Sequence, residues 1–243
     1  RSLAPGVEIV STGRNLGFGP GANVGLRRWL EAGTSEWAAV APHDGAPQPG
    51  CLQRLLAEVS SRSEVGLVSA EFGAGYEYLP VFDKVLGAFY LPRAAGDGWE
   101  ETDYAHGTLL LARRAALEQV GLFDERYFAY CEEADLGIRA RRAGWKVGIV
   151  WGAVVTNQEL PSGPVADYLQ VRNTLLLIKE AHGAYFAGWR SALALAHLAM
   201  TAARDPATAP ARVRLHGGAV VDFWRGRFGA PPSWVSGLAA SVP

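Results

Sequence analysis

Three carboxylates follow an aromatic run in the stretch Gly121–Gly144, GLFDERYFAYCEEADLGIRARRAG. Glu132, Glu133 and Asp135 stand before a group of arginines, and acids at the start with bases at the end complement the dipole of a helix. The stretch therefore predicts a helix that begins at the acids and stops at the final glycine. Crowded, partly buried carboxylates acquire a raised pKa, which suits a general base. Acids that simply favour a helix start are the plainer alternative.

A further acid, Asp44, directly follows the strand predicted for Trp37–Ala41. Ligands bind at the carboxyl ends of strands in open α/β sheets, so its position is one where a binding residue is expected. A single Asp after Pro42 and His43 is also a common turn residue. The residues alone leave both interpretations open.

A glycine-rich loop, RNLGFGPGANVG, links a short apolar strand predicted at Val7–Ser11 to a helix predicted at Ala22–Ala32. Its segment Gly17–Ala22 satisfies the Gly/Ala variant of the dinucleotide-binding fingerprint, and Asp44 falls near the distance of a ribose-binding acid. A dinucleotide-binding Rossmann enzyme is therefore one hypothesis. A turn that needs glycine for positive φ explains the same residues without a ligand.

Strands and helices alternate along residues 1–163, which predicts an α/β domain whose sheet is mostly parallel and lies between helices. Residues 164–243 are predicted to form a helical C-terminal extension, in which 184–203 is strongly apolar. The other predicted strands are Val65–Ala70, His106–Ala112 and Lys146–Val155, and the other predicted helices are a segment after Pro49-Gly50, Arg114–Val120 and Asp167–His182.

The composition excludes several classes of protein. Hydrophobic residues make up 49% of the 243 residues, enough for a sizeable core, and the formal net charge of −1 argues against binding to nucleic acid. Cys51 and Cys131 match no metal or redox spacing and make no disulfide framework, so a reducing cytoplasm is the expected location.

Taken together, the spaced motifs resemble family 2 glycosyltransferases, most closely the bacterial rhamnosyltransferase-like branch. The carboxylate stretch is similar to the family's G-x-F-D-E…(E/D)-D-x-D-L-x-x-R…G segment. Four other stretches agree in order along the chain: RNLGFGPGANVGL, GTLLLARRAALEQVG, YLQVRNTLLLIKEAHG and RLHGGAVVDFWRGRFG.

The resemblance implies a GT-A-like fold and an inverting transfer from a nucleotide-sugar donor, with dTDP-rhamnose as the suggested donor. The acceptor would be a saccharide or a lipid-linked molecule in cell-surface glycan synthesis. Glu133 aligns with the general base, with Glu132 and Asp135 as alternatives, whereas Arg139 and the pair Arg172-Asn173 are interpreted as structural. The other implied site residues are Asn15, Gly17, Asn23 and Asp44 for the donor, and His106, Gly107 and Asp124 on the acceptor side.

Two departures from the family concern the metal. The family binds Mg²⁺ or Mn²⁺ through an Asx-x-Asp motif, of which only Asp44 remains, and Asn157 stands where members carry a His ligand. The glutamate at 133 also replaces the usual aspartate. These departures support a rival hypothesis of a catalytically degenerate, glycosyltransferase-like binding subunit.

Two further expectations concern the ends of the chain. Members of the family begin with a strand, a helix and a strand that bind the nucleobase, and Val7–Ser11 resembles the strand after these; a fragment or a degenerate partner is therefore expected, with weak nucleotide binding. In the extension, 184–203 carries Phe186 and Trp189 with flanking arginines, which predicts a helix packed on the catalytic domain or a peripheral contact with the inner face of the plasma membrane.

Overall fold

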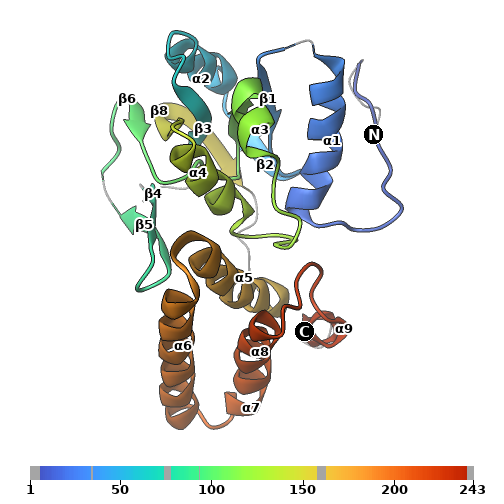
Figure 1. Cartoon of the computed structure of the whole chain (residues 1–243), viewed down its shortest axis with the longest axis vertical. Coiled ribbons are helices and arrows are strands. Elements are labelled where there is room, and N and C mark those ends of the chain that lie inside the picture. Colours follow the sequence, from blue (N-terminus) through green and yellow to red (C-terminus); the bar gives the residue numbers. More distant parts are fainter. Residues whose placement is uncertain (1–5, 34, 74–77, 93, 158–162, 240–243) are drawn as a thin grey trace.

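The computed structural model describes residues 6–33, 35–73, 78–92, 94–157 and 163–239. Figure 1 shows an α/β part that carries the sheet and, below it, a group of helices that starts at Pro164. The elements of the α/β part are, in order, α1 (Phe18–Ala32), β1 (Trp37–Val40), β2 (Gly45–Pro47), α2 (Cys51–Val59), β3 (Val65–Phe72), β4 (Tyr78–Asp83), β5 (Ala88–Pro92), β6 (Gly98–Glu101), β7 (Leu110–Arg113), α3 (Arg114–Val120), α4 (Glu132–Arg142) and β8 (Lys146–Asn157).

The main sheet has the strand order β1-β7-β3-β8-β2, and β6 also pairs with β8. The central pair β3–β8 is parallel, with Val68 opposite Gly148, whereas the other pairs of this sheet are antiparallel. The predicted α/β class is confirmed, but the sheet is mixed rather than mostly parallel. Short connections and returning strands such as β6 and β7 produce antiparallel neighbours, because a parallel neighbour requires a long crossover.

Helices cover both faces of this sheet, so successive residues of its central strand enter different cores. Leu67 of β3 packs in one core with side chains of α1, α3 and α4, whereas Val68 packs in the other with Leu55 and Val59 of α2. The alternation follows from the two-residue period of a strand. β4 and β5 form a separate hairpin, and its Phe82 contacts the ring of His182 in the helical part.

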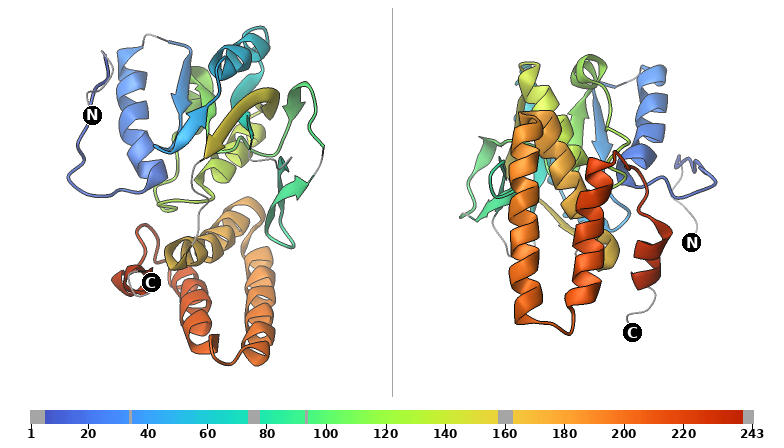
Figure 2. Two further views of the ribbon diagram at one scale, coloured as in Figure 1. Left: turned by 180° about the vertical axis from the view of Figure 1, so that it is seen from behind. Right: turned by 60° about the horizontal axis from the view of Figure 1, so that its bottom comes forward.

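The helical part is joined closely to the α/β part through its first helix. Leu175, Leu176 and Ile178 of this helix are buried in one core with Tyr104 and Tyr127. Two later helices project from it, away from the sheet (Figure 2). The elements of this part are α5 (Pro164–His182), α6 (Ala184–Arg204), α7 (Ala209–Arg212), the π-helical turn η1 (Val213–Gly217), α8 (Gly218–Trp224) and α9 (Ser233–Ala239).

Most predicted elements are confirmed with small shifts of their ends, but one strand is wrong. Residues 7–11 form no strand, and Val7 and Ile9 are 54% and 75% exposed. An apolar segment forms a strand only where a neighbour satisfies its backbone groups, and the described residues provide none. β7 also begins later than predicted, at Leu110, because the preceding residues approach the site described below. Among the described helices, none is both long and apolar enough to cross a membrane.

Candidate active site

The aromatic loop that leads into α4 has an unusual backbone, and buried side chains of α5 hold it. Phe128, Tyr130 and Cys131 all have positive φ, between 66° and 73°, which non-glycine residues rarely adopt. The side-chain amide of Asn173 donates to the carbonyl oxygens of Tyr127 (2.8 Å), Ala129 (2.7 Å) and Tyr130 (3.0 Å). Because the helix begins at the residue after this loop, these bonds fix where its first side chains point.

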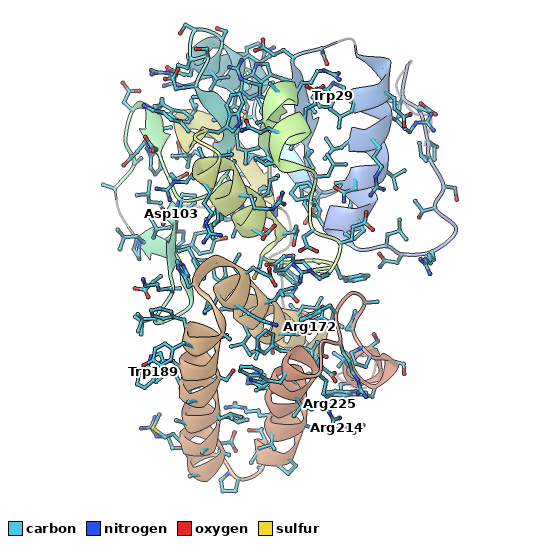
Figure 3. The ribbon with its side chains drawn as sticks, in the orientation of Figure 1. Trp29, Asp103, Arg172, Trp189, Arg214 and Arg225 are labelled. Atoms are coloured by element: carbon cyan, nitrogen blue, oxygen red, sulfur yellow. The ribbon has the colours of Figure 1, made fainter. Side chains whose placement is uncertain are left out.

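Arg172 reinforces the same loop from the neighbouring position. It is buried, donates to the carbonyl oxygen of Gly229 at 2.7 Å and orients the amide of Asn173 at 3.1 Å. Figure 3 shows Arg172 at the junction of the α/β and helical parts. Both residues thus have the structural contacts expected of a supporting role.

The first two residues of α4 are a buried pair of carboxyl groups with different surroundings. Glu132 is 3% exposed. Gly19 packs closely against its aliphatic stem, since a Cβ at Gly19 would lie 3.2 Å from Cγ of Glu132. Burial, together with the charge of Glu133, raises the pKa of Glu132 well above its usual value. Burial raises the pKa of Glu133 to about 6. At neutral pH a carboxyl group with a pKa of about 6 is largely ionised, so Glu133 suits a base near working pH.

Glu133 faces a cavity of about 290 Å³ that lies between the β4–β5 hairpin, α5 and α6. One oxygen of Glu133, Oε2, is buried and has no hydrogen-bond partner among the described residues. Aromatic rings from several elements wall the cavity, and such rings offer flat apolar faces to a sugar. They are Phe89, Tyr90, Tyr104 and Tyr130.

A second, larger groove of about 1100 Å³ follows the exposed edge of β1 and the side of α1. Asn15, Gly17 and His43 line it, and Tyr130 lines both this groove and the cavity of Glu133. Gly17 has φ 90°, and a methyl group there would overlap the carbonyl oxygen of Phe128. The glycine is therefore required for the loop to pass close to the start of α1, independently of any ligand.

The segment from His106 to Thr108 lies between the backbone next to Asp44 and the carboxyl group of Glu133. A Cβ at Gly45, the residue after Asp44, would lie 3.0 Å from the carbonyl oxygen of Thr108. A Cβ at Gly107 would lie 3.8 Å from the carboxyl carbon of Glu133. The strand-end acid and the helix-start acid therefore approach one region of the molecule from two sides.

The remaining predicted residues have partners elsewhere. Asp135 is buried and paired with Arg139 at 2.7 Å, and Arg139 also donates to the carbonyl oxygens of residues 120 and 122. Neither the cavity nor the groove includes Asp135. Asn23 is 1% exposed and exchanges two hydrogen bonds with the backbone of Phe123 (2.8 and 3.0 Å), so its amide holds the turn before the aromatic run.

The side chains of Asp124 and His106 also interact with neighbouring residues of the chain. Burial alone would raise the pKa of Asp124, but hydrogen bonds from the side chain and backbone of Arg126 outweigh it and hold that pKa below its usual value. Nδ1 of His106 accepts a hydrogen bond from the backbone of Thr108 at 3.2 Å, and burial lowers the pKa of the imidazole to about 4. His106 is therefore neutral. Its ring packs against the ring of Tyr90, and the two ring centres are 5.7 Å apart.

Sequence reasoning missed Arg190 of α6 and the tyrosines of the cavity. Arg190 lies in the strongly apolar segment 184–203, where the sequence pattern indicates only a break in hydrophobicity, yet it lines the cavity together with Glu133. Tyr90 lies in the region 72–103, whose weak periodicity predicts a long loop with short strands, and Tyr104 directly follows this region. The one available signal was the concentration of aromatic residues between 72 and 104.

A buried, ionisable carboxylate in an aromatic cavity, next to a groove at a strand end, defines a two-substrate enzyme site of an α/β protein. No protein-family model matches the chain. The chain is 30% identical over 221 residues to the N-acetylglucosaminyl-diphospho-decaprenol L-rhamnosyltransferase of Mycobacterium tuberculosis, covering 78% of this chain and 71% of that protein. It is 24% identical to the low-salt glycan biosynthesis hexosyltransferase Agl10 of Haloferax volcanii over 58% of this chain and 48% of that one. The chain therefore belongs to the family 2 glycosyltransferases, in the rhamnosyltransferase-like branch.

Solved structures with related folds give lower coverage of their own length. The mannosyltransferase PcManGT of Pyrobaculum calidifontis, in complex with GDP-Man and Mn²⁺, superposes with a TM-score of 0.46 at 16% identity, over 87% of this chain and 61% of that one. TarS 1-349 of S. aureus superposes with a TM-score of 0.45 at 13% identity, over 92% and 63%. This chain thus spans less than two thirds of either protein.

The dinucleotide-binding hypothesis is wrong for this chain. Its fingerprint needs a strand before the glycines, and residues 7–11 form none. Gly19 instead permits the close packing of α1 against Glu132. The glycine spacing thus reflects contact with the aromatic loop and with α4.

Proposed function

We propose that this chain transfers a sugar, with inversion, from a nucleotide-sugar donor to a hydroxyl group of a lipid-linked saccharide, with Glu133 as the general base. The observation that carries the proposal is the buried carboxylate of Glu133, with one unpartnered oxygen and a pKa of about 6, facing an aromatic-walled cavity. The relative from M. tuberculosis suggests L-rhamnose as the donor sugar and a polyprenyl-diphosphate-linked saccharide as the acceptor. The family resemblance suggests dTDP as the carrier of that sugar.

In the proposed reaction Glu133 accepts the proton of the acceptor hydroxyl while that oxygen attacks the anomeric carbon. The bond between the anomeric carbon and the diphosphate oxygen breaks, and the nucleoside diphosphate leaves with the bonding electrons. Burial raises the pKa of Glu132 well above its usual value, which favours the uncharged form of this neighbour of the base. Gly107 lies beside the carboxyl group of Glu133, since a Cβ at this position would be 3.8 Å from its carboxyl carbon.

We propose that the groove along α1 and β1 receives the donor. Its lining includes Asn15 and Gly17, which the family resemblance implies for donor binding, and His43, which precedes Asp44. The groove meets the Glu133 cavity at Tyr130. A donor in the groove and an acceptor in the cavity would therefore adjoin at this ring.

The family's divalent cation fits the residues at the end of β1. In the described residues no group of three or more His, Cys, Asp and Glu gathers to hold a metal. However, Gly45, next to Asp44, pairs with Asn157 across β2 and β8, and Oδ1 of Asn157 is buried with no partner in the described part of the chain. We propose that these two oxygen donors hold Mg²⁺ or Mn²⁺, since hard cations bind through few protein oxygens when phosphates supply the rest. When bound, the cation would offset the charge that develops on the leaving diphosphate.

We further propose that α6 brings the site to the membrane surface that carries the lipid-linked acceptor. The helix exposes Trp189 (51%) and Met200 (54%), and Trp189 lies on its outer side, away from α8 (Figure 3). Amphipathic helices with such residues bind the interface of a bilayer. Flotation with anionic liposomes tests this: the chain should float, and a Trp189→Ser, Met200→Ser variant should stay in the dense fraction. Equal flotation of both proteins would refute the contact.

Glu133→Gln tests the catalytic proposal. We expect a loss of about 10²- to 10⁴-fold in kcat with dTDP-rhamnose and a polyprenyl-diphosphate-linked N-acetylglucosamine, because the general base is removed while the shape is kept. Glu118→Gln, an exposed substitution on α3, should retain full activity. NMR of the product checks inversion at the anomeric carbon. Full turnover by Glu133→Gln would remove Glu133 from the base role, and transfer from other sugar nucleotides alone would change the donor.

A further inference from the structure

Arg190 of α6 lies in the wall of the Glu133 cavity and forms no ion pair with the described residues. Its Nε atom is buried and has no hydrogen-bond partner within the described residues, and no carboxylate of that part of the chain lies within ion-pair distance of it. Burial lowers the pKa of Arg190, as expected of a charge removed from water without compensation. The side chain is half-buried, and a buried Nε without a partner is costly, so Arg190 favours an anionic ligand that the chain itself does not supply.

The surroundings of Arg190 are shaped to keep the guanidinium in the cavity. The turn of the β4–β5 hairpin crosses it at Gly87, where φ is 66° and a Cβ would lie 2.7 Å from Nε of Arg190 and 3.0 Å from Thr174. The hairpin is held there by Lys84, whose ammonium lies 4.8 Å from the ring of Phe186 on the same helix. A glycine at 87 is therefore needed for the guanidinium to occupy its place.

On these observations we propose that Arg190 binds the diphosphate of the lipid-linked acceptor, and so forms an anion subsite in the wall of the Glu133 cavity. This inference rests on the proposed function. A guanidinium pairs with phosphate oxygens through two parallel hydrogen bonds, which makes arginine the usual residue for such anions. The donor's own diphosphate is the other anion in the reaction, but Arg190 does not line the groove assigned to the donor.

In this proposal the cavity binds the polar head of one lipid-linked acceptor molecule. Glu133 would meet the reacting hydroxyl, the rings of Tyr90 and Tyr104 would contact the sugar, and Arg190 would hold the diphosphate that follows it. Arg190 also stands next to Trp189 in α6, whose side chain faces outward. The lipid chain attached to the diphosphate would thus leave the cavity at the exposed apolar side of that helix.

The test compares two acceptors with Arg190→Gln. One is N-acetylglucosamine-diphosphate-farnesol and the other is octyl N-acetylglucosaminide, which has no phosphate. We expect the KM for the diphosphate acceptor to rise about 10- to 100-fold, since a charge-assisted pair is lost. The KM for the octyl glycoside and the KM for the donor should stay within about twofold. Arg190→Lys should recover part of the loss, and Arg204→Gln, on the exposed end of the same helix, should have no effect.

Three outcomes separate the possibilities. Equal KM changes for the two acceptors, or none, would overturn the anion subsite while leaving the proposed function intact. A rise in the donor KM alone would assign Arg190 to the nucleotide diphosphate and would also overturn it. Absence of transfer by the unmodified chain to either acceptor would instead count against the proposed function. Thermal unfolding provides a structural control, because removal of an unpaired buried charge should leave the melting temperature of Arg190→Gln unchanged or raised.

Discussion

Replacement of Asn173 by alanine should uncouple the aromatic loop from the helix behind it. The side chain of Asn173 donates to three carbonyl oxygens, at 2.7, 2.8 and 3.0 Å, in a loop with three non-glycine residues at positive φ. Each buried carbonyl left without a partner costs about 1–3 kcal/mol, and part of this cost is recovered where the loop can relax toward water. We therefore expect the free energy of unfolding to fall by about 2–4 kcal/mol, a large share of the roughly 5–15 kcal/mol of a typical domain.

The activity of Asn173→Ala should fall more than its stability alone requires. Relaxation of the loop would move the start of α4, and with it Glu133, and a displacement of about 1 Å can cost roughly 10²-fold in rate. Urea unfolding followed by tryptophan fluorescence measures the stability, and transfer assayed well below the unfolding transition measures kcat. Gln53→Ala is the matched control, since Gln53 is an exposed amide on α2 that lines neither the cavity nor the groove. Asn173→Ala with the stability and kcat of Gln53→Ala would refute the idea that these hydrogen bonds position the base.

Two other predictions concern the same region. Because Glu133 must be ionised to accept a proton and burial raises its pKa to about 6, kcat/KM should fall about tenfold per pH unit below pH 6 and level off above it; a profile that stays flat down to pH 5 would contradict this role. Gly17→Ala should lower the free energy of unfolding by about 2 kcal/mol or more, because φ is 90° and the new methyl group would meet the carbonyl of Phe128. Gly25→Ala, in the same helix with open space around it, should raise stability by about 0.5–1 kcal/mol, and equal effects in denaturant unfolding would remove the steric explanation.

Local pattern was sufficient for the helix at Glu132 and for the central strands of the sheet. The acids and arginines of α4 mark its two ends, and the apolar run of β3 predicts a strand buried on both faces. The spacing of Glu132 and Glu133 could also suggest a crowded pair. It could not show which of the two would face a cavity, because Gly19 of α1 packs against the stem of Glu132, whereas Glu133 faces the space between the β4–β5 hairpin, α5 and α6.

The same limit explains why the strand predicted at Val7–Ser11 is wrong and why the sequence did not identify Arg190 as a residue of the cavity. Val7–Ser11 has the composition of a strand, but pairing is a property of neighbours and not of the segment. Arg190 lies in an apolar helix, where a sequence pattern indicates only a break in hydrophobicity. Its meaning comes from the hairpin turn at Gly87, about a hundred residues earlier in the chain. Contacts between residues so far apart in the sequence are set by the tertiary fold, and the periodicity of a local segment does not predict them.

The positions of the Glu133 cavity and of the groove along α1 and β1 bear on the stereochemistry of the proposed sugar transfer. Glu133 lies in the cavity on one side of Tyr130, whereas Asp44 lies beside the groove on the other side, after the end of β1. If the leaving diphosphate is held near Asp44 and the acceptor hydroxyl near Glu133, the two oxygens approach the anomeric carbon from opposite faces. A single displacement of this kind requires one base and no nucleophilic carboxylate. Inversion is thus part of the proposal and rests on these two positions; it does not depend on which sugar the donor carries.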